Sequence, residues 1–125
     1  MRVFESGANR DDDAHKLDFE GFLSPTVLQA YAEYMHVHRF QEGHIRDSDN
    51  WQRGMPISVY MKSMWRHFFH VWTLYRKRYK PHAYEIRDAL CALLFNVMGM
   101  LYEIEKERAD EQLRWTARQD REGLG

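Results

Sequence analysis

Residues 83–107 constrain the fold most strongly, because their spacing predicts a helix that is apolar on nearly every face. The large apolar side chains are Leu90, Leu93, Leu94, Phe95, Val97, Met98, Leu101 and Ile104. A helix of this kind lies at the centre of a bundle or at a subunit interface. The chain has 125 residues, which fits one domain. A monomer of this size does not easily cover such a helix, so we expect a homodimer or a tetramer.

Residues 25–40 and 58–79 predict two further helices. Ser24 and Pro25 form a helix start, with the serine as N-cap and the proline at the first helical position. Residues 41–57 are rich in turn formers and predict a loop. Since no segment alternates between apolar and polar residues, the expected fold class is all-α, a small helical bundle with three main helices.

We divide the chain into an N-terminal arm at residues 1–23, a helical domain at 24–107 and a charged C-terminal tail at 108–125. The apolar helix is expected to end near Glu107, and the tail is expected to fray. The longest apolar stretch, residues 89–101, is too short to span a bilayer. The first residues lack the apolar segment of a signal peptide.

The chain has 18 Lys and Arg residues against 19 Asp and Glu residues. General binding to nucleic acid or to a membrane surface needs a positive excess, so neither is expected. Cys91 is the single cysteine, which excludes an internal disulfide and favours a reducing compartment. We therefore expect a cytoplasmic protein.

Each predicted helix carries one pair of potential metal ligands spaced i, i+3, so that both members lie on one face. The pairs are Glu33 with His36, His67 with His70, and Glu85 with Asp88. Glu33–His36 and His70 are equally compatible with a solvated helix surface. His67 shares a mostly apolar face and is expected to point inward, either as a core histidine or as a ligand.

Glu85 and Asp88 begin a line of small and polar residues on the otherwise apolar helix. The line continues through Ala89, Ala92, Asn96, Gly99 and Glu103. Small residues allow another helix to approach closely, which would partly desolvate the two carboxylates. Buried carboxylates need a cation or hydrogen bonds. A divalent metal is one solution, and the guanidinium of Arg66 or Arg39 is the competing one.

Several basic residues are candidates for phosphate contacts, and Arg66 is the best of them because it flanks His67. The others include Lys16, Arg39 and Arg46. Trp51 stands in a polar loop, either as a plug over the core or as part of a binding surface. Cys91 is not expected to be a nucleophile, because an apolar environment raises the pKa of a thiol.

Five motifs resemble the phage and prophage family of dATP/dGTP diphosphohydrolase N-terminal domains, and the resemblance covers roughly residues 4–105. They are Lys16-Leu17-Asp18, Phe22-Leu23-Ser24-Pro25, Asp49-Asn50-Trp51-Gln52-x-Gly54-x-Pro56, Arg66-His67 and Asp88-Ala89-Leu90-x-Ala92-Leu93-Leu94-Phe95-Asn96. That family is in turn similar to the MazG-type all-α nucleoside triphosphate pyrophosphohydrolases. MazG-type enzymes hold magnesium with an E-x-x-E pair on one helix and an E-x-x-D pair on the next. Residues 85–88 match the second pair, whereas residues 67–70 read His-x-x-His.

The resemblance implies hydrolysis of purine deoxynucleoside triphosphates to the monophosphate and pyrophosphate. It also implies oligomers that pack the second and third helices across the interface, and activity in the bacterial host's cytoplasm. The implied metal is Mg²⁺ or Mn²⁺, since imidazole suits manganese better than magnesium. The implied metal ligands are His67, His70, Glu85 and Asp88. The implied catalytic residues are Glu33 and Glu85. The implied substrate-binding residues are Lys16, Arg39, Asn50, Trp51 and Arg66.

The His-x-x-His pair and the Met and Trp content, seven and four residues, favour an alternative. In that alternative the protein is a catalytically inactive phage accessory module that senses a nucleotide or binds another protein.

Overall fold

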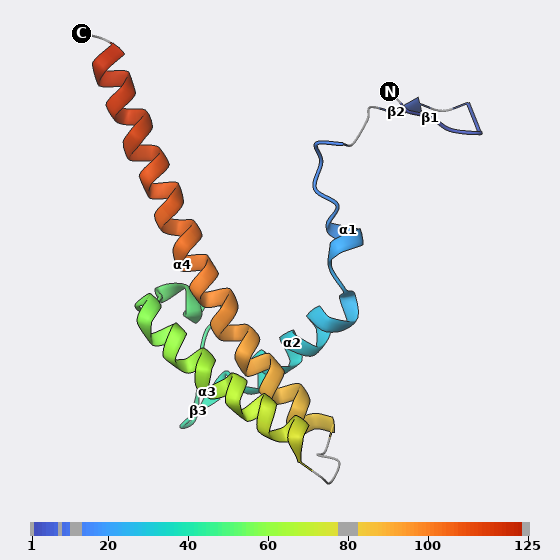
Figure 1. Cartoon of the computed structure of the whole chain (residues 1–125), viewed down its shortest axis with the longest axis vertical. Coiled ribbons are helices and arrows are strands. Elements are labelled where there is room, and N and C mark those ends of the chain that lie inside the picture. The colour runs from blue at the N-terminus through green and yellow to red at the C-terminus, as the bar shows by residue number, and fades with distance from the viewer. Residues whose placement is uncertain (1, 8, 11–13, 78–82, 124–125) are drawn as a thin grey trace. The chain divides into compact units, whose positions relative to one another are not determined.

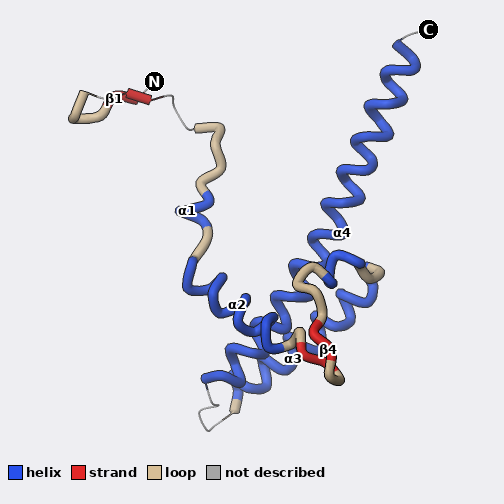
Figure 2. Tube along the Cα trace, turned by 180° about the vertical axis from the view of Figure 1, so that it is seen from behind, coloured by secondary structure: helices blue, strands red, loops and turns tan. Residues whose placement is uncertain are grey.

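The computed structural model describes residues 2–7, 9–10, 14–77 and 83–123. In this part of the chain the protein is all-α, with α1 at Phe19–Phe22, α2 at Pro25–Val37, α3 at Ile57–Arg76 and α4 at Ala83–Gly123 (Figure 1). The remaining elements are short strands and one 3₁₀ helix (Figure 2). The chain forms two compact units, Met1–Ala32 and Glu33–Gly125, which are described separately below.

The first unit contains a two-stranded antiparallel ribbon that was not predicted within the arm. β1, Arg2–Val3, pairs with β2, Asn9–Arg10, so that Arg2 lies opposite Arg10. The predicted start of α2 is confirmed, because the Ser24 hydroxyl accepts a hydrogen bond from the Val27 amide at 3.3 Å. This bond satisfies one of the amides that a helix start leaves without an intrahelical partner.

In the second unit, α2 ends at Val37, three residues before the expected end, and a tight hairpin follows. β3, Phe40–Gln41, pairs with β4, His44–Ile45, across a turn in which Glu42 and Gly43 both have positive φ. The expected loop therefore contains a β-hairpin, followed by the 3₁₀ helix η1 at Asn50–Arg53. The turn residues were recognised, but their hairpin geometry was not.

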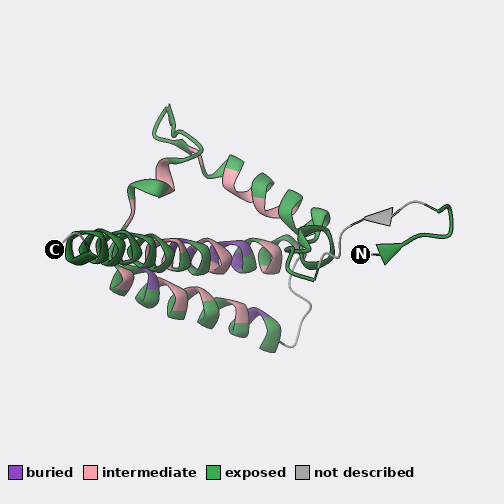
Figure 3. Cartoon of the chain, turned by 90° about the horizontal axis from the view of Figure 1, so that it is seen from above, coloured by how far each residue is buried: buried purple, intermediate pink, exposed green. Residues whose placement is uncertain are grey.

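α3 and α4 lie side by side and antiparallel, and they hold most of the core (Figure 3). The buried residues of the described chain are Tyr60 and Leu74 on α3, and Ala89, Cys91, Ala92, Asn96 and Gly99 on α4. Tyr60 packs directly over Gly99. The small-residue line predicted on the third helix is thus confirmed as the surface that lets α3 approach.

The ends of α3 and α4 compare differently with the prediction. The described part of α3 ends at Arg76, and the predicted end at residue 79 lies outside the described residues. α4 does not end near Glu107 but continues to Gly123. The charged stretch is rich in strong helix formers, and Glu105 pairs with Arg108 one turn away, so the helix has local support without a core. None of the described helices has the length and hydropathy needed to cross a bilayer.

Candidate functional site

An ion pair joins α2 to the first turns of α4. Arg87 donates from Nη2 to the Glu33 carboxylate at 2.6 Å, and the Arg87 guanidinium also lies 5.7 Å from the centre of the Tyr84 ring. A guanidinium from Arg66 or Arg39 was expected as the alternative to a metal beside Glu85 and Asp88, and that alternative stays a prediction. The Arg87 guanidinium was not expected in a pair, and it pairs with Glu33.

Tyr34, the residue after Glu33, is turned toward the same part of α4. Burial raises the pKa of the Tyr34 hydroxyl, and the nearby Asp88 carboxylate and Cys91 thiol raise it further. Burial likewise raises the pKa of Cys91, with Arg87 opposing the shift and Asp88 adding to it. Cys91 therefore stays a thiol, as expected from its apolar surroundings.

Glu85 and Asp88 are both exposed, although the line of small residues that follows them is buried. The expected partial burial of these carboxylates is therefore wrong for the single chain. Burying a carboxylate removes its hydration, which costs free energy. A carboxylate at the edge of a helix contact therefore stays in water unless a bound cation offsets that cost. The assignment of both residues as metal ligands stays a prediction.

His67 is half-buried and His70 is exposed on α3. Burial lowers the pKa of His67, and electrostatic interaction with Arg66 and then with His70 lowers it further. Counting along the antiparallel helices from the Tyr60–Gly99 contact places His67 level with Ala92 and His70 level with Ala89 of α4. The expectation that His67 points inward is confirmed, and its neutral ring is the form that binds metals.

The donor set fits a divalent cation in its chemistry, since carboxylate oxygens suit magnesium and neutral imidazole nitrogens suit manganese. Over the ranges 2–7, 9–10, 14–77 and 83–123, however, no three His, Cys, Asp or Glu side chains form one group that could hold a metal.

The predicted phosphate-binding residues have different surroundings. Arg39 donates from Nε to the Arg46 carbonyl at 2.8 Å, and Arg46 donates to the His38 carbonyl at 3.0 Å, so these two arginines brace the hairpin. Arg66 is exposed beside His67. Lys16 is exposed in the first unit.

Asn50 and Trp51 lie in η1, and Trp51 is half-buried against α4. The Trp51 ring meets the Tyr102 ring edge-on, with centroids 4.8 Å apart. Trp51 therefore acts as a plug over α4, which was one of its two expected roles. Its assignment as a base-stacking residue stays a prediction.

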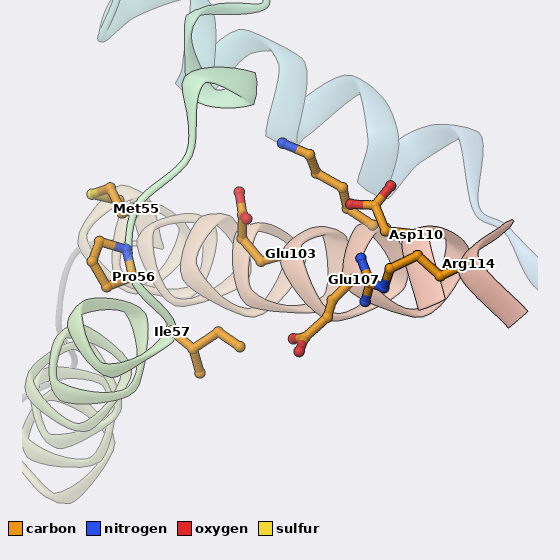
Figure 4. A pocket seen from close by; sticks show the side chains of 8 residues that line it. Met55, Pro56, Ile57, Glu103, Glu107, Asp110 and Arg114 are labelled. Carbon is orange, nitrogen blue, oxygen red and sulfur yellow. The ribbon is translucent and has the colours of Figure 1, made fainter. Parts of the chain in front are cut away.

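A second polar site, which was missed in the sequence, lies where α3 begins (Figure 4). Met55, Pro56 and Ile57 form one side of a pocket of about 320 Å³. The α4 residues Glu103, Lys106, Glu107, Asp110 and Arg114 complete its lining. Glu103 lies against Gly54, and its Oε1 atom is buried without a hydrogen-bond partner. The sequence feature that could have indicated this pocket is the helical spacing of charged residues from residue 103 onward. It was missed because that stretch was interpreted as the end of a helix followed by a frayed tail.

Comparison of the chain with protein-family models, with curated proteins and with solved structures gives no match.

Proposed function

We propose that this protein is a metal-dependent deoxynucleoside triphosphate diphosphohydrolase that converts dATP and dGTP to the monophosphate and pyrophosphate. One observation carries the proposal beyond the motif resemblance. The Arg87–Glu33 ion pair joins α2 to α4 at the residue before Asp88, and Tyr34 of α2 also lies near Asp88. Hydrolysis of a polyphosphate needs such oxygen donors, because it depends on positioning and charge neutralisation.

Glu85, Asp88 and His67, with His70, would hold Mg²⁺ or Mn²⁺. The bound ion would neutralise phosphate oxygens and lower the pKa of a water. In the reaction, the water oxygen bonds to the α-phosphorus, the bond from that phosphorus to the α–β bridging oxygen breaks, and pyrophosphate leaves with the electron pair.

Glu33 would accept the proton that the attacking water loses. Arg66 would neutralise charge on the phosphates from α3, and Asn50 and Trp51 would contact the base. Arg39 contributes less to phosphate binding, since its guanidinium already braces the hairpin. We further propose that the enzyme acts on free nucleotides in the cytoplasm of a phage-infected bacterium and that it is a homo-oligomer.

The double substitution Glu85→Gln with Asp88→Asn tests the proposal. Pyrophosphate release from dGTP and dATP, measured with Mg²⁺ and with Mn²⁺, should fall roughly 100-fold or more, because the ligands contribute several kcal/mol to the barrier. Glu105→Gln is the matched control, and turnover should not change in it. Glu105 is also an exposed carboxylate of α4, and it pairs with Arg108, which lies one helical turn further along. Unchanged turnover in the double variant would refute the assignment.

The accessory-module alternative is favoured by a different observation, the large apolar side chains exposed on α3 and α4. Thermal unfolding separates the candidates. Metal with a purine deoxynucleoside triphosphate stabilises an enzyme or a sensor, whereas a pure protein-interaction module shows no shift. Only the enzyme releases pyrophosphate.

A further inference from the structure

The outer side of α3 carries aromatic rings and positive charges in one line. The line consists of Lys62, Trp65, Phe69, Trp72 and Arg76, which follow one another at intervals of three and four residues, and we call it the aromatic–basic stripe. Trp65, Phe69 and Trp72 are 68%, 61% and 50% exposed. Lys62 and Arg76, at the two ends, are exposed as well. A row of large rings that stay open to solvent indicates a binding surface.

The stripe points away from α4. Tyr60 and Leu74, the buried residues of α3, stand two heptads apart and share the face that meets α4. At about 100° per residue, the stripe is centred roughly 180° around the helix from that face. All five of its members are exposed, so the stripe is open to a partner.

The segment that bears the stripe is positive. α3 contains Lys62, Arg66 and Arg76 but no Asp or Glu. The sequence has no Asp or Glu between Asp49 and Glu85. The balanced charge of the whole chain argues against general binding to nucleic acid, but the acidic residues that balance it lie outside this segment. A local positive excess of this kind attracts a polyanion.

Rings that alternate with charges match the chemistry of a single-stranded nucleic acid. Its bases stack on aromatic side chains and its phosphates pair with Lys or Arg, with little dependence on base sequence. The Phe69 and Trp72 rings meet edge-on, with centroids 5.8 Å apart, which restricts the rotation of both rings and lowers the cost of ordering them on binding. From Lys62 to Arg76 the stripe is roughly 21 Å long, which corresponds to about six nucleotides of a stacked strand.

Two other polyanionic partners fit the stripe less well. A helix that lies on a bilayer separates its apolar face from its charged face, so that the charges stay among the headgroups. Here Lys62 and Arg76 lie in line with the rings and at the same depth. In a duplex the bases are enclosed in the stack, so the rings would not reach their faces.

We infer that the aromatic–basic stripe binds single-stranded nucleic acid, with bases on its three rings and phosphates on Lys62 and Arg76. The inference does not depend on the hydrolase proposed above, since none of the five residues belongs to the proposed site. Strand binding without pyrophosphate release would leave the inference standing and refute only the hydrolase. Pyrophosphate release without strand binding would do the reverse.

Fluorescence anisotropy tests the inference on the full chain. The probe is a fluorescein-labelled oligothymidylate of about twelve nucleotides, whose pyrimidine bases differ from the purine substrates proposed above. The dissociation constant should rise roughly tenfold between about 50 and 200 mM salt, because two or three phosphate contacts release counterions.

Trp72→Leu should raise the dissociation constant about fivefold or more, because one stacked base loses its platform. Trp115→Leu is the matched control, since Trp115 is 55% exposed on α4 and lies outside the stripe. This control should bind the probe as tightly as the unmodified chain.

Lys62→Gln is a second variant, which removes a charge from an exposed side chain and decides the question if Trp72→Leu fails to fold. It should reduce the slope of log Kd against log salt by about 0.7, the contribution of one phosphate on a single strand. Lys106→Gln, at an exposed lysine of α4, is its control and should leave the slope unchanged.

Three results would overturn the inference: an unmodified chain that does not bind the probe, equal weakening in Trp72→Leu and Trp115→Leu, or equal affinity for a duplex of the same length. A chain that binds phosphatidylglycerol vesicles through Trp72 but not the probe would assign the stripe to a membrane surface and would also overturn it.

Discussion

At Gly99, α4 comes so close to α3 that there is no room for a side chain. A Cβ atom built there would lie 2.5 Å from Cε1 of Tyr60, and Tyr60 is only 1% exposed. The ring of a buried tyrosine has little space to move, unlike the end of a flexible surface side chain. Gly99 therefore sets the distance between the two helices.

We expect Gly99→Ala to lower the free energy of unfolding by about 1–2 kcal/mol. Overpacking a core costs about 1–3 kcal/mol, and the higher helix propensity of alanine offsets up to about 1 kcal/mol of this. Urea unfolding followed by circular dichroism measures the change. Gly123→Ala is the control, because nothing lies within 4 Å of a Cβ at that helical glycine, and it should cause no loss. Equal effects of the two substitutions would contradict the proposed close contact.

His67 should make stability depend on pH. Its pKa in the folded chain is lowered from 6.5 by burial, then by Arg66 and His70, so the unfolded chain binds the proton more readily. The contribution is therefore complete above about pH 6.5 and is lost as pH falls toward the folded pKa. Urea unfolding of His67→Gln across pH 5 to 7.5 should show a smaller loss of stability on acidification. A pH profile identical to that of the unmodified chain would show that His67 is not coupled to folding.

α2 illustrates how local sequence sets the start of an element. Pro25 has no amide hydrogen to satisfy, and Ser24 satisfies the amide of Val27 with its hydroxyl. α3 begins differently, because its N-cap is Pro56 and no side chain caps it. The same type of element thus starts with and without a side-chain cap in one chain.

Ser24→Ala should destabilise α2 by about 1 kcal/mol, since it removes the capping acceptor. Amide hydrogen exchange at Val27 reports the change locally, with faster exchange expected. Ser58→Ala, inside the first turn of α3, is the comparison and should be neutral or slightly stabilising, because alanine is the better helix former. If exchange at Val27 were unaffected, the serine hydroxyl would not be the effective cap.

α4 shows how far helical spacing alone could be followed. Its apolar residues predicted the helix up to residue 107, and the small residues among them predicted the side that meets α3. Beyond that point no apolar periodicity remains, and the end at Gly123 depends on propensity and on pairs such as Glu105–Arg108. A method that follows core-facing residues therefore ends the helix too early.

The second unit buries few large side chains for the amount of apolar surface it carries. Within the described chain only Tyr60 and Leu74 are large and almost fully buried, whereas Trp65, Phe68, Phe69 and Trp72 are at least half exposed. An exposed apolar surface of this extent marks an interaction site more often than a free surface. The excess of apolar residues that predicted an oligomer in the sequence is thus located on particular faces of α3 and α4.

The amino-acid sequence alone determined the all-α class, the start of α2, the inward direction of His67 and the small-residue side of α4, because helical periodicity and capping are local properties of the chain. The partner of Glu33, the exposure of Glu85 and Asp88 and the packing of Trp51 on Tyr102 depended on how α2, η1 and α4 meet. Contacts between residues far apart in sequence are fixed by side-chain shape and by the cost of removing charge from water. Spacing along a single helix carries no information about either.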